Sequence, residues 1–340
     1  MVTFLSQTQL PNQLQNVFTM KIAITGGSGF IGSNLVRFYL EKGYQVLNLD
    51  VNPPSDSASH PYWVKCDIMD ADTTQDILLH FDPQYVIHMA ARTDLRATHI
   101  EDYAINIGGV ANVLNIAHSI RGLKKIIFAS SMLVCEAGYI PEDDLDYCPS
   151  NLYGQSKVAG ERLVREQENL GLNWVIVRPT SIWGPGFGPP YRSFFEAILQ
   201  GRYVNFAGCE NPKTYGYIGN IVEQIDAILH SDTTDHNTYY LGDYEPLNIR
   251  DWSNEIADLL NQRIPTVPKF FIVMVAKVGD VLESVGLSFP LTSFRLKNIT
   301  IRWVLPLENT QSVAPKVMYS RFDGIRETLE WLKKTNRRNQ

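Results

Sequence analysis

The sequence has few cysteines, little net charge and no long apolar run. Its four cysteines form no C-x-x-C pair and lie near no cluster of histidines, so we expect no metal site. A disulfide framework is not expected in a chain of 340 residues. The net charge of −6 offers no positive surface for a nucleic acid. The first nineteen residues lack the basic and apolar regions of a secretory leader, so the expected location is the cytoplasm.

The longest apolar run in the C-terminal third is FFIVMVA, at 270–276. A helix that crosses a bilayer needs about 20 predominantly apolar residues, so this run is too short to span one. We expect it to form the buried face of a helix.

Short apolar runs alternate with amphipathic stretches from Lys21 onward. Strands are predicted where the runs lie, at 21–26, 45–50, 62–68, 84–91, 124–131 and 173–180. Helices are predicted between them, at 30–43, around 105–119 and around 151–157. Mostly apolar strands that alternate with helices indicate a parallel sheet covered on both faces. The predicted fold class is therefore α/β, with a doubly wound parallel sheet of the Rossmann type.

The segment TGGSGFIG, at 25–32, lies between the first predicted strand and the first predicted helix. Its glycines Gly26, Gly29 and Gly32 let the backbone approach a pyrophosphate, while free N–H groups at the helix start face the anion. Such a glycine motif predicts a dinucleotide site because it follows a strand and opens a helix.

The second predicted strand ends at Asp50. An acid at this position accepts hydrogen bonds from the ribose hydroxyls of the adenosine and repels a 2′-phosphate. The residues that follow, VNPPSDS, contain no Arg or Lys that could bind such a phosphate. NAD is therefore favoured over NADP.

The segment NLYGQSK, at 151–157, places Lys157 four residues after Tyr153. With sixteen tyrosines in the chain, about one Tyr-x-x-x-Lys pair is expected by chance, so the pair alone proves nothing. On a helix the two side chains lie on one face. A phenol has an unperturbed pKa of about 10, and a nearby ammonium favours its ionised form.

Taken together, these motifs resemble the extended short-chain dehydrogenase/reductase family and, within it, the NAD-dependent sugar-nucleotide epimerases and dehydratases. The resemblance runs from about Lys21 to Leu332. The motifs that carry it are TGGSGFIG (25–32), Asp50, Asp67-Ile68, HMAA (88–91), Asn106, FASS (128–131), YGQSK (153–157) and RPTSIWGPG (178–186). The family also implies a homodimer, formed through the helices near 103–119 and around Tyr153.

The resemblance implies a role for each matching residue. Tyr153 would take the proton from a substrate hydroxyl while the hydride of the same carbon moves to NAD. Ser131 would hydrogen-bond the same oxygen, with Ser130 as the alternative, and Lys157 would also hold the nicotinamide ribose. The implied cofactor contacts are Gly26, Gly29, Phe30, Ile31, Gly32, Asp50, Asp67, Ile68, Ala90, Ala91, Asn106, Tyr153, Lys157 and Pro179. The implied substrate contacts are Thr93, Ser131, Thr180, Arg192, Lys213 and Arg295.

The residues after Ser131 separate the subfamilies. The 4,6-dehydratases resemble one another in carrying an acid immediately after this serine, and decarboxylases of nucleotide-sugar acids usually carry a Glu there. This chain has Met132 and Leu133, and neither side chain can transfer a proton. Dehydration and decarboxylation are therefore disfavoured, and epimerisation, at C4 by analogy with the family, is the leading interpretation. Cys135 is interpreted as a packing residue.

Two other functions are considered. The first is a dehydrogenase or ketoreductase that exchanges its NAD and acts on a sugar nucleotide or a sterol-like alcohol; the apolar segment near 268–289 favours it. The second is a non-catalytic NAD-binding protein, which the presence of Ser131, Tyr153 and Lys157 disfavours.

The domain boundary is expected where the sequence changes character after Thr180. Residues 20–180 are predicted to form the NAD-binding Rossmann domain. Residues 181–332 are predicted to form mainly a smaller α/β substrate-binding lobe, with segments that return to the Rossmann sheet. Residues 1–19 are predicted to be an extension, and 333–340 a basic tail.

Overall fold

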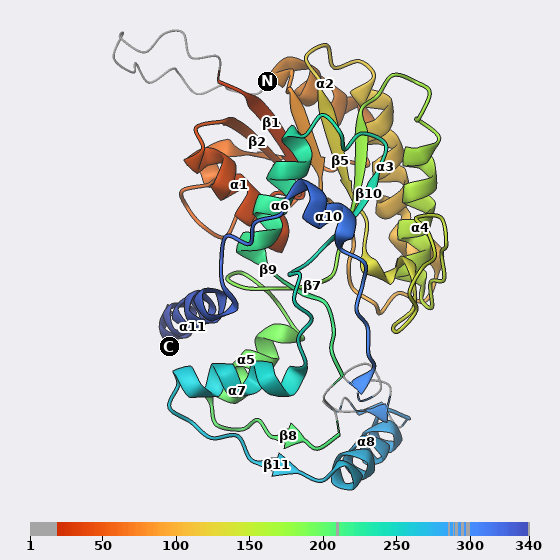
Figure 1. Cartoon of the computed structure of the whole chain (residues 1–340). Coiled ribbons are helices and arrows are strands. Elements are labelled where there is room, and N and C mark those ends of the chain that lie inside the picture. Colours follow the sequence, from red (N-terminus) through yellow and green to blue (C-terminus); the bar gives the residue numbers. More distant parts are fainter. Residues whose placement is uncertain are drawn as a thin grey trace.

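The fold is built around one large parallel sheet, with a smaller lobe below it in Figure 1. This computed structural model describes residues 19–208, 211–284 and 300–338, together with 286, 287, 289, 292, 293 and 296. Nearly all of the predicted extension at 1–19, and the end of the basic tail, therefore lie outside the described residues.

The large sheet has seven strands, all parallel to their neighbours. In spatial order they are β10 (Thr238–Leu241), β6 (Trp174–Pro179), β5 (Lys125–Ala129), β4 (Tyr85–His88), β1 (Lys21–Thr25), β2 (Gln45–Asp50) and β3 (Trp63–Lys65). The order 3-2-1-4-5-6 is that of a doubly wound sheet, in which ligands bind beyond the carboxyl ends of the strands where the order reverses. The predicted fold class is therefore confirmed, and the reversal lies between β1 and β4.

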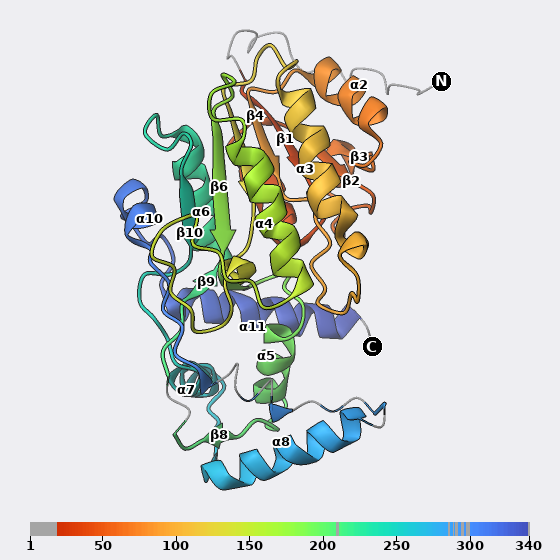
Figure 2. The ribbon, with the colours of Figure 1, turned by 90° about the vertical axis from the view of Figure 1, so that its right-hand side faces the viewer.

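Helices cover both faces of the sheet, which explains why its strands are apolar almost throughout. On one face lie α2 (Ala71–Phe81), α3 (Ala104–Ala117) and α4 (Leu152–Arg165), side by side in Figure 2. On the other face lie α1 (Phe30–Glu41) and α6 (Ile218–His230). Three 3₁₀ helices lie in the connections, η1 (His60–Tyr62), η2 (Ile100–Tyr103) and η3 (Met132–Val134).

The smaller lobe is formed by segments after Thr180. It contains α5 (Tyr191–Leu199), α7 (Ile249–Leu259), α8 (Lys269–Ser284) and the paired strands β8 (Asn205–Phe206) and β11 (Thr266–Val267). The pair β7 (Ser181–Trp183) and β9 (Tyr215–Tyr217) joins it to the sheet, and α10 (Glu308–Val313) and α11 (Arg321–Arg338) follow near the chain end. Two segments of this half belong to the Rossmann part instead: β10 is a strand of the large sheet, and α6 packs on one face of that sheet.

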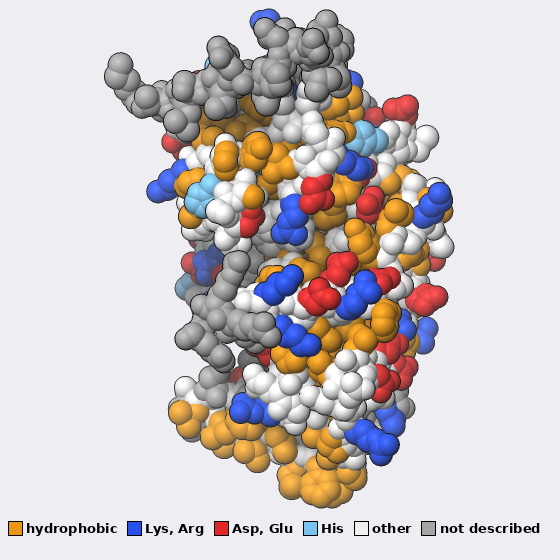
Figure 3. Space-filling view, turned by 90° about the vertical axis from the view of Figure 1, so that its left-hand side faces the viewer, with side chains coloured by type: hydrophobic (Ala, Val, Ile, Leu, Met, Phe, Trp, Pro, Cys, Tyr) orange, Lys and Arg blue, Asp and Glu red, His pale blue; other side chains and the backbone are white. Residues whose placement is uncertain are grey.

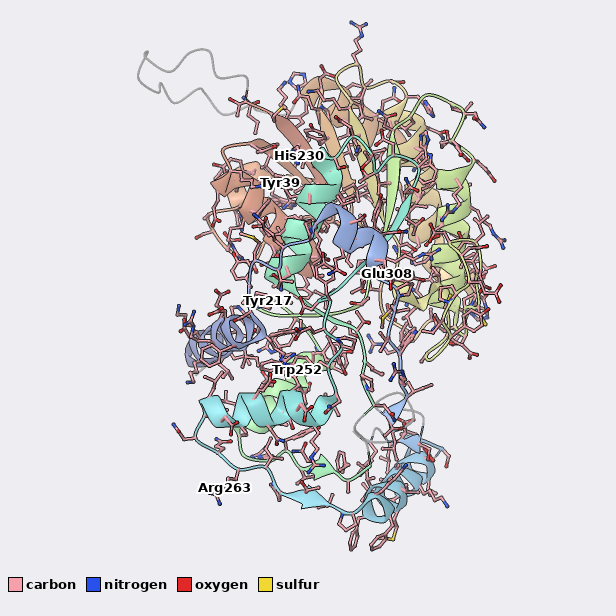
Figure 4. The ribbon with its side chains drawn as sticks, viewed as in Figure 1. Tyr39, Tyr217, His230, Trp252, Arg263 and Glu308 are labelled. Carbon is pink, nitrogen blue, oxygen red and sulfur yellow. The ribbon has the colours of Figure 1, made fainter. Side chains whose placement is uncertain are left out.

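Aromatic side chains hold α5, α7 and β9 together. The fully buried Trp252 lies at the centre of this cluster (Figure 4), with the ring of Tyr215 4.9 Å away and that of Trp183 5.1 Å away. Phe195 of α5 packs edge-on against the same indole ring at 5.5 Å. This core fixes the lobe directly beneath the carboxyl ends of the large sheet.

The prediction for the apolar run at 270–276 is half right. It does form a helix, α8, but four of its side chains, Phe270, Phe271, Met274 and Val275, are between 41% and 61% exposed. The expected burial is right for Ile272 and Ala276 of the run and wrong for these four, because they lie on the side of the helix that faces away from the lobe. None of the helices in the described ranges is both long and apolar enough to cross a membrane.

Candidate active site

A cavity of about 510 Å³ opens at the carboxyl ends of β1, β4 and β5, where the strand order reverses. The glycine segment forms its floor. Gly26 has a φ of +70°, and a Cβ atom there would lie 2.6 Å from the backbone nitrogen of Ala90. A Cβ on Gly32 would lie 2.1 Å from the carbonyl oxygen of Gly26. Only glycine fits either position, so the backbone stays open to a ligand at the start of α1.

Asp50 ends β2 on the same side of the cavity. Its carboxylate accepts hydrogen bonds from the backbone N–H of Ser28 at 3.0 Å and of Asn52 at 2.9 Å. These bonds tie the carboxylate to the glycine segment and leave lone pairs for a ribose diol. The glycine segment and Asp50 therefore fit an adenine dinucleotide.

A second polar group in the cavity is the buried hydroxyl of Ser130. It has no hydrogen-bond partner among the described residues and can bind the same ligand.

Tyr153 and Lys157 enter the cavity from the first two turns of α4. Asn151 begins this helix, because its side chain accepts a hydrogen bond from the backbone N–H of Gly154 at 2.8 Å. The Lys157 ammonium lies 6.0 Å from the centre of the Tyr153 ring and donates to the carbonyl of Ala129 at 2.9 Å. The strand–helix connection thus brings the end of β5 and the start of α4 to one place.

Burial opposes the ionisation of both groups. It raises the pKa of Tyr153 to about 12, although a hydrogen bond with Ser131 lowers it in part. Burial also lowers the pKa of Lys157 to about 8, against an opposing effect of Glu161. At neutral pH the protein alone therefore holds a protonated phenol beside a charged ammonium. Further positive charge in the cavity is needed before Tyr153 can act as a base.

Sixteen of the residues predicted for the site line this one cavity. They are Gly26, Gly29, Phe30, Ile31, Gly32, Asp50, Asp67, Ile68, Ala90, Ala91, Thr93, Ser131, Tyr153, Lys157, Pro179 and Thr180. Both Ser130 and Ser131 line it, but the hydrogen bond with Tyr153 is made by Ser131.

Three of the other four predicted residues do not line this cavity. Asn106 bridges neighbouring segments instead: its amide oxygen accepts from the backbone N–H of Arg92 at 2.8 Å, and its amide nitrogen donates to Ser156 of α4 at 2.9 Å. Arg192 pairs with Glu196 at 2.9 Å. Lys213, whose pKa burial lowers to about 8, pairs through its backbone with Leu247. Arg295 lies outside the described residues.

Several cavity residues were not predicted. They are Ser28, Leu49, Val51, Asn52, Cys66, Met89, Ile105, Ala129 and Ile182. Most of them are next to a predicted residue at the end of β1, β2, β4 or β5. Their position at a strand end could therefore have predicted them. Cys135, by contrast, is fully buried away from the cavity, and its thiol donates to the carbonyl of Asp146 at 3.3 Å, as expected of a packing residue.

Replacing Asp50 by Asn is expected to weaken NAD binding about 10- to 100-fold. A hydrogen bond to a charged group is worth about 1.5–3 kcal/mol, and the amide makes weaker bonds to a ribose diol. Discrimination against NADP should fall as well, since the repelling charge is gone. Titration calorimetry of the nucleotide-free protein with both cofactors measures this. The exposed Asp72→Asn variant is the matched control, and an unchanged NAD affinity in Asp50→Asn would contradict the assignment.

The fold and this cavity define a dinucleotide-binding α/β enzyme with a Ser-Tyr-Lys constellation. The model of the NAD dependent epimerase/dehydratase family matches residues 22–242. The chain belongs to this family, and the predictions of an extended short-chain dehydrogenase/reductase enzyme and of NAD as its cofactor are confirmed.

Individual relatives are more distant. A 3 beta-hydroxysteroid dehydrogenase/Delta 5-->4-isomerase of Mycobacterium tuberculosis is 29% identical, over 72% of this chain and 70% of its own. The N-acetyl-alpha-D-glucosaminyl-diphospho-ditrans,octacis-undecaprenol 4-epimerase of Escherichia coli O157:H7 is 26% identical, over 91% of this chain and 94% of its own. The UDP-glucose 4-epimerase of Thermotoga maritima, solved with UDP-glucose, has the same fold, with a TM-score of 0.72 at 21% identity over 93% of this chain and 100% of its own.

Proposed function

We propose that this protein is an NAD-dependent epimerase that inverts C4 of a sugar carried on a diphosphate and retains its NAD through turnover. The observation that carries the proposal is the single cavity in which Ser131, Tyr153 and Lys157 meet the glycine segment and Asp50. Two relatives support the sugar diphosphate, since one is named as a 4-epimerase of a sugar on diphospho-undecaprenol and the other as a UDP-glucose 4-epimerase.

The chain's own residues can perform the proton transfers. Bound NAD supplies the acceptor and later the donor of the hydride. Ser131 and Tyr153 hold the oxygen of the reacting hydroxyl, and Tyr153 takes its proton and later gives it back. Lys157 supplies a positive charge, which it retains below a pH of about 8. Met132 and Leu133 follow Ser131 in the chain, and neither side chain can transfer the proton that elimination of water from the oxidised sugar requires.

The test is to denature the purified protein and identify the released nucleotide by chromatography against NAD and NADH standards. About one NAD per chain is expected, because an epimerase returns the hydride to the carbon it oxidised and needs no exchange. A panel of UDP- and polyprenyl-diphosphate-linked sugars should then show inversion without net NADH. If the protein is purified without bound nucleotide and binds added NAD only weakly, the proposal that it retains NAD through turnover is contradicted.

A dehydrogenase of an apolar alcohol is the second candidate. Met132 and Leu133 pack against a cluster of buried apolar side chains that includes Trp303 and Leu305, so the wall that follows Ser131 is apolar. The relative named as a hydroxysteroid dehydrogenase favours the same idea. This function would produce one NADH per substrate molecule in solution, which separates it from an epimerase.

We also propose a homodimer that associates through α3 and α4, and a cytoplasmic location. Thr93, Thr180, Arg192, Lys213 and Arg295 stay predictions as substrate contacts. Of these, Thr93 and Thr180 have the support of lining the cavity.

A further inference from the structure

The helix α8 has an exposed apolar side. Six of its large apolar side chains are between 41% and 63% exposed: Phe270, Phe271, Met274, Val275, Val278 and Val281. Residues three, four and seven apart lie on one side of a helix, and these six share one such side. The helix has 16 residues and is about 24 Å long, so the exposed side is a continuous strip. Single exposed apolar residues are common, but a continuous strip marks an interaction surface.

The opposite side of α8 is packed, so the exposure is a property of the folded lobe. Ile272, Ala276 and Gly279 are buried there. Ile272 and Ala276 form a small core with Leu296, against which Phe206 of β8 packs. A helix that is apolar on both sides is normally buried on both sides. Here the lobe buries one side of α8, and the other side is exposed.

The helix α8 lies at the end of the molecule farthest from the large sheet (Figures 1 and 2). Figure 3 shows hydrophobic side chains gathered at this end, with Lys and Arg side chains close by. A helix at the end of the molecule with one exposed apolar side can lie flat in the interface of a membrane.

The charge around the strip differs from that of the whole chain. Among the described residues from Arg263 to Arg302 there are four Lys and Arg residues and two Asp and Glu residues, a net charge of +2 in a chain with a net charge of −6. Lys269 and Lys277 lie on α8, and Asp280 and Glu283 lie nearer its C-terminal end, all four exposed. Arg263 adds a cation at the same end of the molecule (Figure 4). An apolar strip flanked by cations is complementary to a surface of anionic lipid headgroups.

We propose that α8 docks the protein on an anionic lipid bilayer. Its apolar strip enters the boundary between headgroups and acyl chains, and its lysines stay among the headgroups. The names of two relatives agree with an enzyme that works at a lipid surface, since one acts on an undecaprenol-linked sugar and the other on a hydroxysteroid. This inference goes beyond the proposed function, because lipid binding requires no catalytic turnover.

The test is cosedimentation of the full chain with vesicles. Vesicles of phosphatidylcholine mixed with phosphatidylglycerol should bind the protein, vesicles of phosphatidylcholine alone should bind it less, and added salt should weaken the binding. The triple variant Phe271→Gln, Met274→Gln, Val278→Gln should lower the partition coefficient about 100-fold, since three apolar side chains no longer leave water. Glutamine keeps the helix, being a good helix former.

The matched control replaces three apolar residues elsewhere that are somewhat more exposed, Leu145→Gln, Leu170→Gln and Met318→Gln, and should bind vesicles like the unaltered chain. Both triple variants should retain their NAD, which shows that they are folded whether or not the protein is an epimerase. The proposal would be overturned if the unaltered chain bound neither kind of vesicle, or if the control variant lost as much vesicle binding as the α8 variant. So would an oligomer, seen by light scattering, that dissociates only in the α8 variant, because a second copy would then cover the strip.

Discussion

Replacing Tyr153 by Phe is expected to lower the rate of sugar oxidation about 10²- to 10⁴-fold, the range that a positioned acid–base group contributes. The substitution removes one oxygen atom and leaves the ring, which packs against the ring of Tyr103 at 5.9 Å. Without the phenol, the proton of the substrate hydroxyl has no acceptor, since Ser131 has an unactivated hydroxyl and Lys157 is charged at neutral pH. The rate is measured in a single turnover, from the appearance of bound NADH.

The control for this prediction is Tyr103→Phe. The Tyr103 hydroxyl donates to the carbonyl of Asp94 and does not line the cavity, so its removal should leave the rate nearly unchanged. NAD content should stay near one per chain in both variants, because the cradle at Gly26 and Gly32 is untouched. A Tyr153→Phe protein that keeps its NAD and its full rate would exclude Tyr153 as the acid–base group.

The sequence was informative about the fold wherever local chemistry determines the structure. Each predicted strand from 21–26 to 173–180 is present with its boundaries shifted by a few residues. Two strands are shortened most, 84–91 to Tyr85–His88 and 62–68 to Trp63–Lys65. Asp67 and Asp70 explain the early end of the strand at 62–68, since their carboxylates accept from the backbone N–H of Met69 and Thr73 and turn the chain into α2.

The site was predictable to the extent that strand ends and motifs place residues at one edge of a sheet. Long-range contacts were not predictable: the side of α8 that is buried depends on where Phe206 lies. Arg192 pairs with Glu196 one turn along its own helix and does not line the cavity. An apolar pattern alone indicates a helix face but cannot say which of two apolar sides the rest of the chain covers.

One long-range contact bears directly on α4, the helix that carries Tyr153 and Lys157. Arg178 of β6 is fully buried and donates to the two carboxylate oxygens of Glu161, at 2.8 and 2.7 Å. Glu161 lies on α4, four residues after Lys157, and Arg178 directly precedes Pro179 at the cavity wall. Burial lowers the pKa of Arg178, but the bonds with Glu161 outweigh it and raise that pKa overall. The pair therefore fixes α4 against the sheet.

Replacing Arg178 by Met is expected to lower the free energy of unfolding by about 3–5 kcal/mol, because it leaves the carboxylate of Glu161 buried without its charged partner. Urea titration measures the change. The double variant Glu161→Gln, Arg178→Met should recover much of it, since the buried charge is then gone and the amide still accepts from the hydroxyl of Tyr147.

The exposed pair of Arg326 and Asp323 is the matched control, at 3.2 Å and with both side chains more than a third exposed. Arg326→Met should change the free energy of unfolding by no more than about 1 kcal/mol, as water and salt screen such a pair. If Arg178→Met were no more costly than Arg326→Met, the ion pair would not be what holds α4 to the sheet. The positions of Tyr153 and Lys157 would then depend on the apolar contacts of α4 with α3 and on the packing of Val164, at the end of α4, against the sheet.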